Sequence, residues 1–309
     1  MANDIRGSHL VIDGIPREKG DYRPDMSAGP LYEVIRVIDG KCLFLDDHLA
    51  RLRHSFRAIE TARTESFPDD LVRTSLRTLL KVSSISEGNV RICLYLPGHD
   101  AGTVQEPIPT QPGKARHPRQ SSHANDTLFQ GFKPPSQVHC YFIPHTYPDA
   151  AQYENGVSMC TYRHERPRPG VKKWDPAFRR SVQDFIARQA IYEALLVDPN
   201  GRVLEGSRSN VFFLSRDNRV LTPPVEHVLP GITQKHIFAL CEKNEIPISG
   251  QNLYLSDLNQ MTACFLSGTS PKILPVCCID GQRFDPGHPL LQRLMKAFDT
   301  VIHQNLQPC

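Results

Sequence analysis

The sequence predicts a mixed α/β protein of two domains, and three observations carry this prediction. The chain has 309 residues, 39% of them apolar, which exceeds the length at which one core usually keeps growing. Strand-like and helix-like segments alternate along most of it, with several turns typical of hairpins. A stretch rich in Pro, Gly, Gln, Ser and His interrupts this pattern, and such a composition forms no core. We therefore expect a small α/β domain over 31–137, with a disordered insertion over 98–135, and a larger domain over 138–309.

The first domain follows residues 1–30, which are polar, rich in Gly, Pro and Asp, and predict an irregular arm. Apolar runs on both sides of Asp39-Gly40 predict a hairpin starting at Leu31, because these two residues accept the positive φ of a tight turn. The next segment begins with an Asp at the cap position and repeats apolar residues at helical spacing. A second helix is expected over 70–82, and strands over 89–96 and 138–144.

The second domain alternates strands with helices. Proline in the first turn predicts a helix over 176–191, and apolar spacing predicts two more, over 233–244 and 290–302. The expected strands are short apolar runs with turn residues between them, namely 154–162, 192–197, 211–214, 219–222, 263–267 and 273–279.

Composition excludes several classes of partner. A net charge of +3 gives little reason to expect nucleic acid, and the basic run over 114–119 lies in the insertion, where a solvated linker is the simpler interpretation. The nine cysteines form no C-x-x-C pair and no Cys/His spacing typical of a metal site. No leader and no apolar run long enough to cross a bilayer is present. A reduced, cytoplasmic, soluble protein is expected.

Glu205 is a carboxylate in an unusual sequence environment. The stretch EALLVDPNGRVLEGSRSNVFFL places Glu205 among small polar residues, beside strands that should be buried. Further along the chain, LPGITQKH and FLSGTSPKILPV each bring a turn with free backbone N–H groups and a Thr hydroxyl. Helix N-termini and such turns favour anions. Together these segments indicate a site for a phosphate monoester.

Five segments in this order resemble a known family. They are YEVIRVIDGKCLFLDDHLARLRHS, a K-x-x-[ND] step in KKWD, YEALLVDPNGRVLEGSRSNVFF, LPGIT and SGTS followed by PV. The chain is similar to the fold-type IV pyridoxal phosphate enzymes, which include branched-chain aminotransferases, D-amino acid aminotransferases and aminodeoxychorismate lyases. The resemblance covers most of the chain from Leu31 to Val276, apart from the insertion. It implies pyridoxal 5'-phosphate as the cofactor, a homodimer, and a site between the two domains.

The resemblance also implies roles for individual residues. Lys172 matches the lysine that carries the cofactor, with its neighbour Lys173 as the competitor, since adjacent residues of an extended segment point to opposite sides. Glu205 matches the acid that keeps the pyridine ring protonated. Arg51 matches the phosphate-binding arginine, whose guanidinium suits a phosphate dianion. The remaining phosphate donors would be Ile232 and Thr233 at a helix N-terminus and Thr269 in SGTS.

The substrate side is less well marked. Period-two alternation places Tyr32, Val34 and Arg36 on one face of the first strand. In this family that face looks into the substrate pocket, where Arg36 could receive a carboxylate; an ordinary place on the sheet surface stays an equal alternative for each. The Arg-x-His that traps carboxylates in the D-amino acid enzymes has no counterpart here. The Asn-Tyr pair after the lysine of branched-chain enzymes is replaced by Asp175-Pro176.

The function that these residues imply is a ping-pong transfer of an amino group from an amino acid to a 2-oxo acid, of the branched-chain or D-amino acid type. Lys172 would move the proton at the substrate Cα. Three alternatives stay open. One is a lyase of the aminodeoxychorismate type, which would use the same lysine and glutamate. The second is a non-catalytic homologue that acts as a binding protein. The third is an interaction protein that binds through the basic run.

Overall fold

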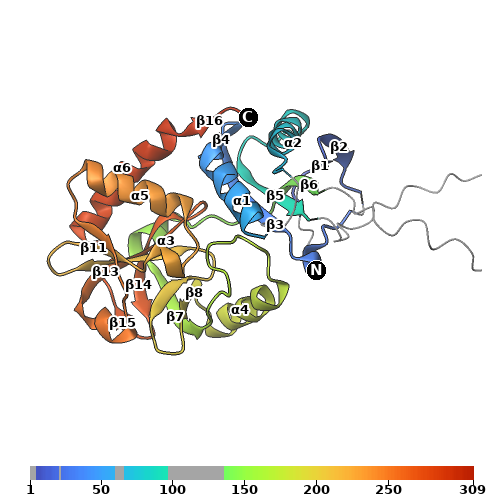
Figure 1. Cartoon of the computed structure of the whole chain (residues 1–309). Helices are drawn as coiled ribbons and strands as arrows, with labels where there is room; N and C mark the ends of the chain where they lie inside the picture. The colour runs from blue at the N-terminus through green and yellow to red at the C-terminus, as the bar shows by residue number, and fades with distance from the viewer. Residues whose placement is uncertain (1–4, 21, 60–65, 97–135) are drawn as a thin grey trace, which may run out of the picture.

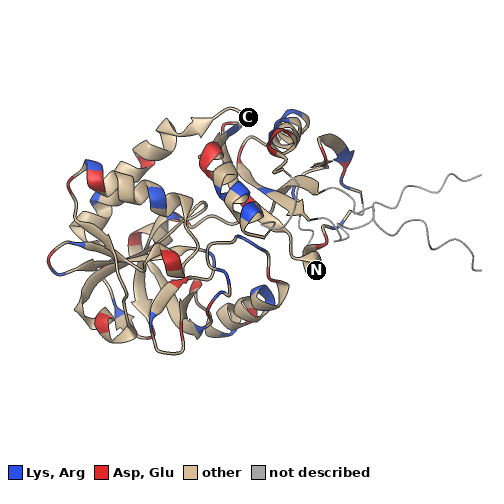
Figure 2. Cartoon of the chain, viewed as in Figure 1, with Lys and Arg blue, Asp and Glu red and all other residues tan. Residues whose placement is uncertain are grey.

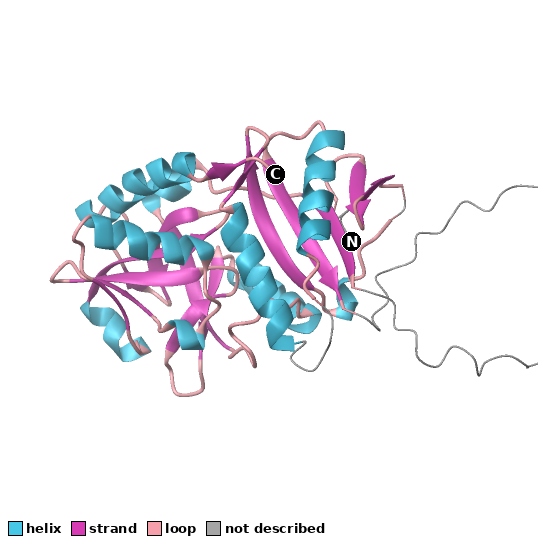
Figure 3. Cartoon of the chain, turned by 45° about the horizontal axis from the view of Figure 1, so that its top comes forward, coloured by secondary structure: helices cyan, strands magenta, loops and turns pink. Residues whose placement is uncertain are grey.

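The computed structural model describes residues 5–20, 22–59, 66–96 and 136–309. Two β-sheets form two parts of the molecule, and helices pack against both of them (Figures 1 and 3). The insertion expected over 98–135, with its basic run, lies outside the described residues. The mixed α/β class expected from the sequence is confirmed.

The first sheet has seven strands in the order β16-β4-β3-β5-β6-β1-β2, and all neighbours are antiparallel. The hairpin between β3 and β4 turns at Asp39 and Gly40, whose φ angles are 50° and 70°, as the sequence predicts. The strands are β1 (His9–Ile12), β2 (Ile15–Glu18), β3 (Leu31–Ile38), β4 (Lys41–Leu43), β5 (Gly88–Tyr95), β6 (Gln137–Ile143) and β16 (Leu306–Gln307).

Helices α1 (Leu45–Ile59) and α2 (Asp69–Val82) cover one face of this sheet. Leu49, Leu52 and Phe56 of α1 are buried in the core between the helices and the strands. The predicted helix begins at Leu45, before the aspartate expected at its cap, so Asp46 and Asp47 both lie in its first turn. Negative charge there still suits the positive end of the helix dipole.

The opposite face of the first sheet is aromatic and points away from α1 and α2. Tyr32 of β3, Tyr95 of β5 and Tyr141 of β6 lie on it, together with Cys93. The segment before β3, which contains the 3₁₀ turn η1 (Met26–Ala28), packs against these side chains. This face is the one that the chain brings toward the site described below.

Three features of the first sheet correct the sequence predictions. The expectation of an irregular arm over 1–30 is wrong for β1 and β2, which pair with each other, while β1 also pairs with β6. Strand β6 extends this sheet beyond residue 137, where we expected the second domain to begin. The end of the chain returns to the first sheet as β16, which pairs with β4. Pairing partners far away in the sequence stabilise these short segments, and local composition does not reveal them.

The second sheet has the order β12-β11-β10-β13-β14-β7-β8-β9, with β15 paired to β14. Its neighbours are antiparallel except for the parallel pairs β11·β12, β14·β7 and β7·β8. The strands are β7 (Val157–Arg163), β8 (Glu193–Val197), β9 (Val203–Gly206), β10 (Asn210–Ser215), β11 (Val220–Thr222), β12 (Ile248–Gly250), β13 (Met261–Gly268), β14 (Lys272–Ile279) and β15 (Gln282–Arg283).

Helices flank this second sheet. The predicted helices are confirmed as α4 (Pro176–Gln189), α5 (Ile232–Lys243) and α6 (Pro289–Gln304). Helices α5 and α6 share a core with Phe212 and Phe265, whose rings stack at 4.9 Å. A short helix that we did not predict, α3 (Ala150–Asn155), shortens the strand expected over 154–162. The remaining 3₁₀ turns are η2 (Val225–His227) and η3 (Leu255–Gln260).

Charges of both signs are interspersed over the described part of the chain (Figure 2). Within the ranges that the structure describes, no helix combines the length and apolar content needed to cross a bilayer. The fold therefore places helix α1 of the first part and several loops of the second sheet around a common space, and Tyr32 of the aromatic sheet face contacts Lys172 beside it.

Candidate active site

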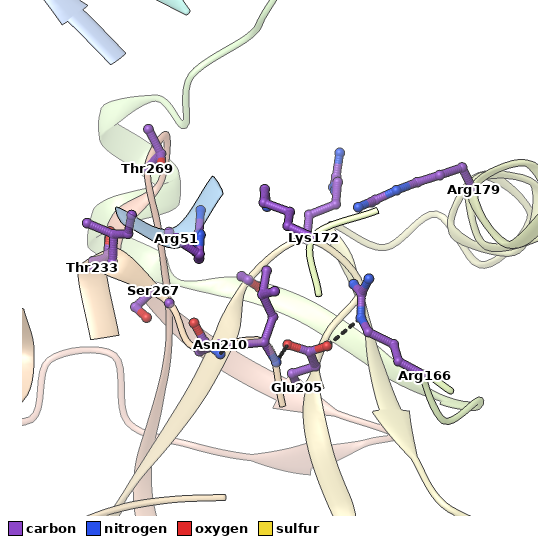
Figure 4. Close-up of a pocket in the computed structure, with 15 residues that line it drawn as sticks. Arg51, Arg166, Lys172, Arg179, Glu205, Asn210, Thr233, Ser267 and Thr269 are labelled. Atoms are coloured by element: carbon purple, nitrogen blue, oxygen red, sulfur yellow. Dashed lines mark hydrogen bonds and ion pairs between the residues drawn. The ribbon is translucent and has the colours of Figure 1, made fainter. Parts of the chain in front are cut away.

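One pocket collects side chains from helix α1, which packs on the first sheet, and from several parts of the second sheet (Figure 4). Helix α1, the segment between β7 and α4, the end of β9, the start of α5 and the turn after β13 all contribute to its lining. Its empty volume is about 450 Å³. All six residues that the resemblance assigns to the cofactor line it, namely Arg51, Lys172, Glu205, Ile232, Thr233 and Thr269.

Lys172 lies on an extended segment that is fixed from two sides. Its backbone N–H donates to Ser55 Oγ at 3.1 Å, and its carbonyl accepts from the backbone N–H of Tyr32 at 3.1 Å. The Nζ atom lies 4.9 Å from the centroid of the Tyr32 ring. Burial lowers the pKa of Lys172; Tyr32 opposes this shift, whereas the positive charge of Arg51 adds to it. A lysine with a lowered pKa has a larger neutral fraction, which amine chemistry requires.

Lys173, the competitor, lies elsewhere. It is exposed, does not line the pocket, and lines a second cavity with Trp174 and Gly29 instead. Its backbone forms an isolated bridge with Leu31. The two adjacent lysines thus face different spaces, as expected for an extended segment.

Glu205 is 4% exposed and has two partners. Its Oε1 accepts from Arg166 Nε at 2.6 Å, and its Oε2 accepts from the backbone N–H of Leu229 at 3.1 Å. Burial raises the pKa of Glu205, and the charge of Arg166 opposes that shift. Sequence reasoning missed Arg166. It comes from the arginine-rich stretch RHERPRPG before Lys172, in which nothing local distinguishes it from its neighbours.

The loop after Glu205 is held by a second buried carboxylate. Glu193 of β8 accepts from Ser207 Oγ and, at 3.4 Å, from Ser209 Oγ. A Cβ on Gly206 would collide with Ser209 Oγ, so any other residue at that position would force this hydroxyl to move. Asn210 then donates from Nδ2 to the carbonyl of Leu229 at 2.9 Å, which ties the loop to the segment before α5.

Arg51 reaches the pocket from α1 and is held by an acid that we did not predict. Its Nε and Nη2 atoms donate to the two carboxylate oxygens of Glu33, at 2.8 and 2.7 Å. His48 Nδ1 lies 2.8 Å from Glu33 Oε2. Burial would raise the pKa of Glu33, but the charge and hydrogen bonds of Arg51 hold it well below its usual range. The fork of Arg51 is therefore fixed, and Nη1 donates to the carbonyl of Pro230 at 3.1 Å.

The other anion-binding elements lie on the opposite side of the pocket from Arg166 (Figure 4). Ile232 and Thr233 begin α5, so their backbone N–H groups stand at a helix N-terminus. Thr269 lies in the turn after β13. Ser267, which sequence reasoning did not single out, lines the pocket, and its buried Oγ has no hydrogen-bond partner among the described residues. A buried hydroxyl without a partner fits a site for phosphate oxygens.

Neither of the two site residues predicted on the substrate side lines the pocket, but Tyr32 lies next to it and contacts Lys172. Tyr32 is 4% exposed, contacts the ring of Trp174 edge-on at 5.3 Å, and accepts a hydrogen bond from Arg179 Nη2 at 2.8 Å. The structure does not bring Arg36 into the pocket. Its guanidinium lies 4.4 Å from the centroid of the Tyr147 ring.

These residues fit the cofactor that the resemblance implies. A buried carboxylate, a lysine with a lowered pKa and a cluster of donors at a helix N-terminus line one pocket. The carboxylate suits the pyridine nitrogen of pyridoxal phosphate, the lysine suits its aldehyde, and the donors suit its phosphate.

Known sequences identify the family. The family model described as "Amino-transferase class IV" matches residues 30–279. A D-alanine aminotransferase of Bacillus licheniformis is 29% identical over 278 residues, covering 89% of this chain and 87% of that protein. A branched-chain-amino-acid aminotransferase of Salmonella typhimurium is 27% identical over 284 residues, covering 87% and 82%.

Solved structures agree with the fold. The branched-chain amino acid aminotransferase of Escherichia coli superposes with a TM-score of 0.75 at 20% identity, covering 98% of this chain and 97% of that one. A hypothetical aminotransferase from Mycobacterium tuberculosis, in its PLP-bound form, gives a TM-score of 0.72 at 20% identity, covering 96% and 99%. The chain therefore belongs to the class IV aminotransferases, enzymes that work with pyridoxal phosphate.

Proposed function

We propose that this aminotransferase holds its cofactor in the pocket around Lys172 and moves an amino group from an amino acid to a 2-oxo acid there. One observation carries the proposal: Lys172, Glu205 and the donors at the start of α5 line the same pocket, although they are far apart in sequence. Bound pyridoxal phosphate would supply an acceptor for the electrons left when the substrate Cα loses its proton.

The residues of the chain have separate tasks in this proposal. Lys172 carries the cofactor and then, once free, takes and returns the proton of the substrate Cα at Nζ. Its lowered pKa supports this task. Glu205 presents a carboxylate to the ring nitrogen, with Arg166 holding it in place. Arg51, Thr233 and Thr269 bind the phosphate.

The substrates are proposed from the relatives. The curated relatives named above are D-alanine and branched-chain-amino-acid aminotransferases, so we propose D-alanine and the branched-chain amino acids as the donors to test first. We also propose a homodimer, as the family resemblance implies, and a cytoplasmic location.

The first test is the visible absorption spectrum of the purified protein with pyridoxal phosphate, before and after a panel of L- and D-amino acids. Conversion of the bound cofactor to its amine form by one donor supports the proposal and names the substrate. With aminodeoxychorismate as the substrate, release of more than one equivalent of pyruvate per site without a 2-oxo acid acceptor would point to the lyase instead. Binding without any conversion, or no binding, would favour the non-catalytic alternative. Light scattering measures the oligomeric state.

A further inference from the structure

We infer that Arg179 receives the carboxylate of the substrate, so that this site selects amino acids against simple amines. The inference rests on the proposed function. It assigns a role to a residue that neither a sequence motif nor the family resemblance indicated. The known carboxylate-trapping Arg-x-His has no counterpart in the sequence, and Arg36 does not reach the pocket. Another cation is therefore needed.

The local sequence directs Arg179 to the site. Asp175 caps α4 by accepting from the backbone N–H of Phe178 at 2.9 Å, and Pro176 occupies the first turn. The helix thus begins four residues after Lys172. Side chains of a helix lean toward its N-terminus, so Arg179, in the first turn, reaches back toward Lys172 (Figure 4). The Asp-Pro step that departs from the branched-chain pattern is the feature that creates this geometry.

Charge pairing distinguishes Arg179 from the other arginines of the pocket. Arg51 is paired with Glu33, Arg166 with Glu205, and Arg208 with Glu193 at 3.6 Å. Arg179 has no carboxylate partner among the described residues. A partly buried guanidinium without a counter-ion is costly unless an anion joins it.

The partners that Arg179 does have are a carbonyl oxygen and a phenol oxygen, and neither is a carboxylate. Nη1 donates to the carbonyl of Ser207 at 3.1 Å and Nη2 donates to Tyr32 Oη at 2.8 Å. These bonds fix the plane of the guanidinium, and the group retains further N–H donors for a ligand. A planar fork of donors matches a carboxylate in both shape and charge.

The position also suits the reaction. Tyr32 touches both cations: its ring centroid lies 4.9 Å from Lys172 Nζ, and its hydroxyl accepts from Arg179. The carboxylate of an amino acid is bonded to the same Cα whose proton Lys172 would move. A carboxylate receptor must therefore lie beside that lysine. The phosphate donors Thr233 and Thr269 lie on the other side of the pocket (Figure 4).

The test compares pairs of donors that differ in the carboxylate alone. Leucine is compared with leucinamide and with isoamylamine, and D-alanine with D-alaninamide, in single turnovers followed by the visible band of the bound cofactor. The proteins are the wild type, Arg179→Gln, Arg179→Lys, and Arg180→Gln as a matched control. Arg180 is the next residue of α4 and is exposed. Cofactor affinity and the pH titration of the band without substrate are measured for each protein.

The wild type should prefer the acid to its amide, and Arg179→Gln should reduce this preference by about 10-fold to 100-fold, the range of a charged hydrogen bond. Arg179→Lys should restore part of it, and Arg180→Gln should match the wild type. Cofactor affinity should not change.

Two results would overturn the inference. One is an acid-to-amide preference that Arg179→Gln leaves unchanged, or a wild type without any such preference. The other is a shifted titration of the band with an unchanged preference, which would assign Arg179 to the cofactor. Failure of the proposed function looks different, because then the wild type converts no donor at all. If Arg179→Gln does not fold, the inference is still tested by the acid-to-amide preference of the wild type and of Arg179→Lys.

Discussion

Arg166 Nε lies 2.6 Å from Glu205 Oε1, and the two side chains are only 15% and 5% exposed. This buried ion pair joins the segment that carries Lys172 to the end of β9. It holds the acid on which the proposed cofactor chemistry depends. The cost of burying Glu205 is therefore offset by a residue 39 positions away in the sequence.

Arg166→Met should destabilise the protein by about 3 kcal/mol at pH 7, because it leaves a buried carboxylate without its cation. The pKa of Glu205, already raised by burial, should rise further. The folded state then binds more protons than the unfolded state above the usual pKa of a glutamate, so the deficit should grow with pH. Urea unfolding between pH 4 and pH 7 measures it, with exposed Arg188→Met as the control. A deficit independent of pH would contradict this explanation.

Lys172→Ala should reduce amino transfer by a factor of at least about 100, the lower end for loss of a general base, whereas Lys173→Ala should retain most of it. The same change should stabilise the fold by about 1 kcal/mol, since functional sites often reduce stability. The pKa of Lys172 is lowered in the folded state, so the unfolded state binds more protons, and wild-type stability should rise as the pH approaches the unfolded lysine value of about 10.4 from below. Thermal unfolding of the three proteins tests this. Equal activities for the two variants would exclude Lys172 from the proposed role.

Tyr32 should ionise near neutral pH. Burial raises the pKa of its phenol, but the charges of Arg179, Lys172 and other cations lower it to about 7, against an ordinary value of 10. Ultraviolet difference spectra of the cofactor-free protein should show one tyrosine titrating there. The step should be missing in Tyr32→Phe and should move to higher pH in Arg179→Gln, while Tyr254→Phe, at an exposed position, leaves it in place. A step that survives in Tyr32→Phe would assign it to another group.

Glu33→Gln should lower the free energy of unfolding by about 3 kcal/mol, because it removes the acid between buried Arg51 and His48. The pKa of Glu33 is held far below its usual range. Its contribution should therefore be complete above the unfolded pKa of about 4.3 and be lost as the pH falls below that value. Cofactor affinity should also fall, since Arg51 loses the partner that orients it. Unfolding curves at pH 7 and pH 3.5 check the first point, and spectral titration checks the second. An unchanged affinity would mean that Glu33 acts on stability alone.

The local elements were accessible from the sequence because their causes are local. Positive-φ residues at Asp39 and Gly40 produce the hairpin, and Pro176 in the first turn starts α4. Apolar spacing predicts the long helices. The six cofactor residues were assigned by resemblance to motifs of a few residues each, and the structure brings all six to one pocket.

The partners of the charged residues were not accessible in this way. Nothing in the local sequence marks these partners. Other arginines lie close to Arg166 and next to Arg179, and Glu33 alternates with apolar residues on a strand. Each is distinguished only by what it meets across the fold: Glu205, Tyr32 and Arg51. The same holds for Arg36. Its position on the strand was predicted, but its contact with Tyr147 was not.

The sequence by itself determined the long helices, most of the longer strands, the hairpin turn at Asp39-Gly40 and the family motifs, because backbone preferences and apolar periodicity act over a few residues. Only the tertiary structure decided that β1 and β16 complete the first sheet, and which cations are paired in the pocket. Both depend on contacts between segments distant in the chain. The free energy of such a contact depends on burial and geometry that no local pattern contains.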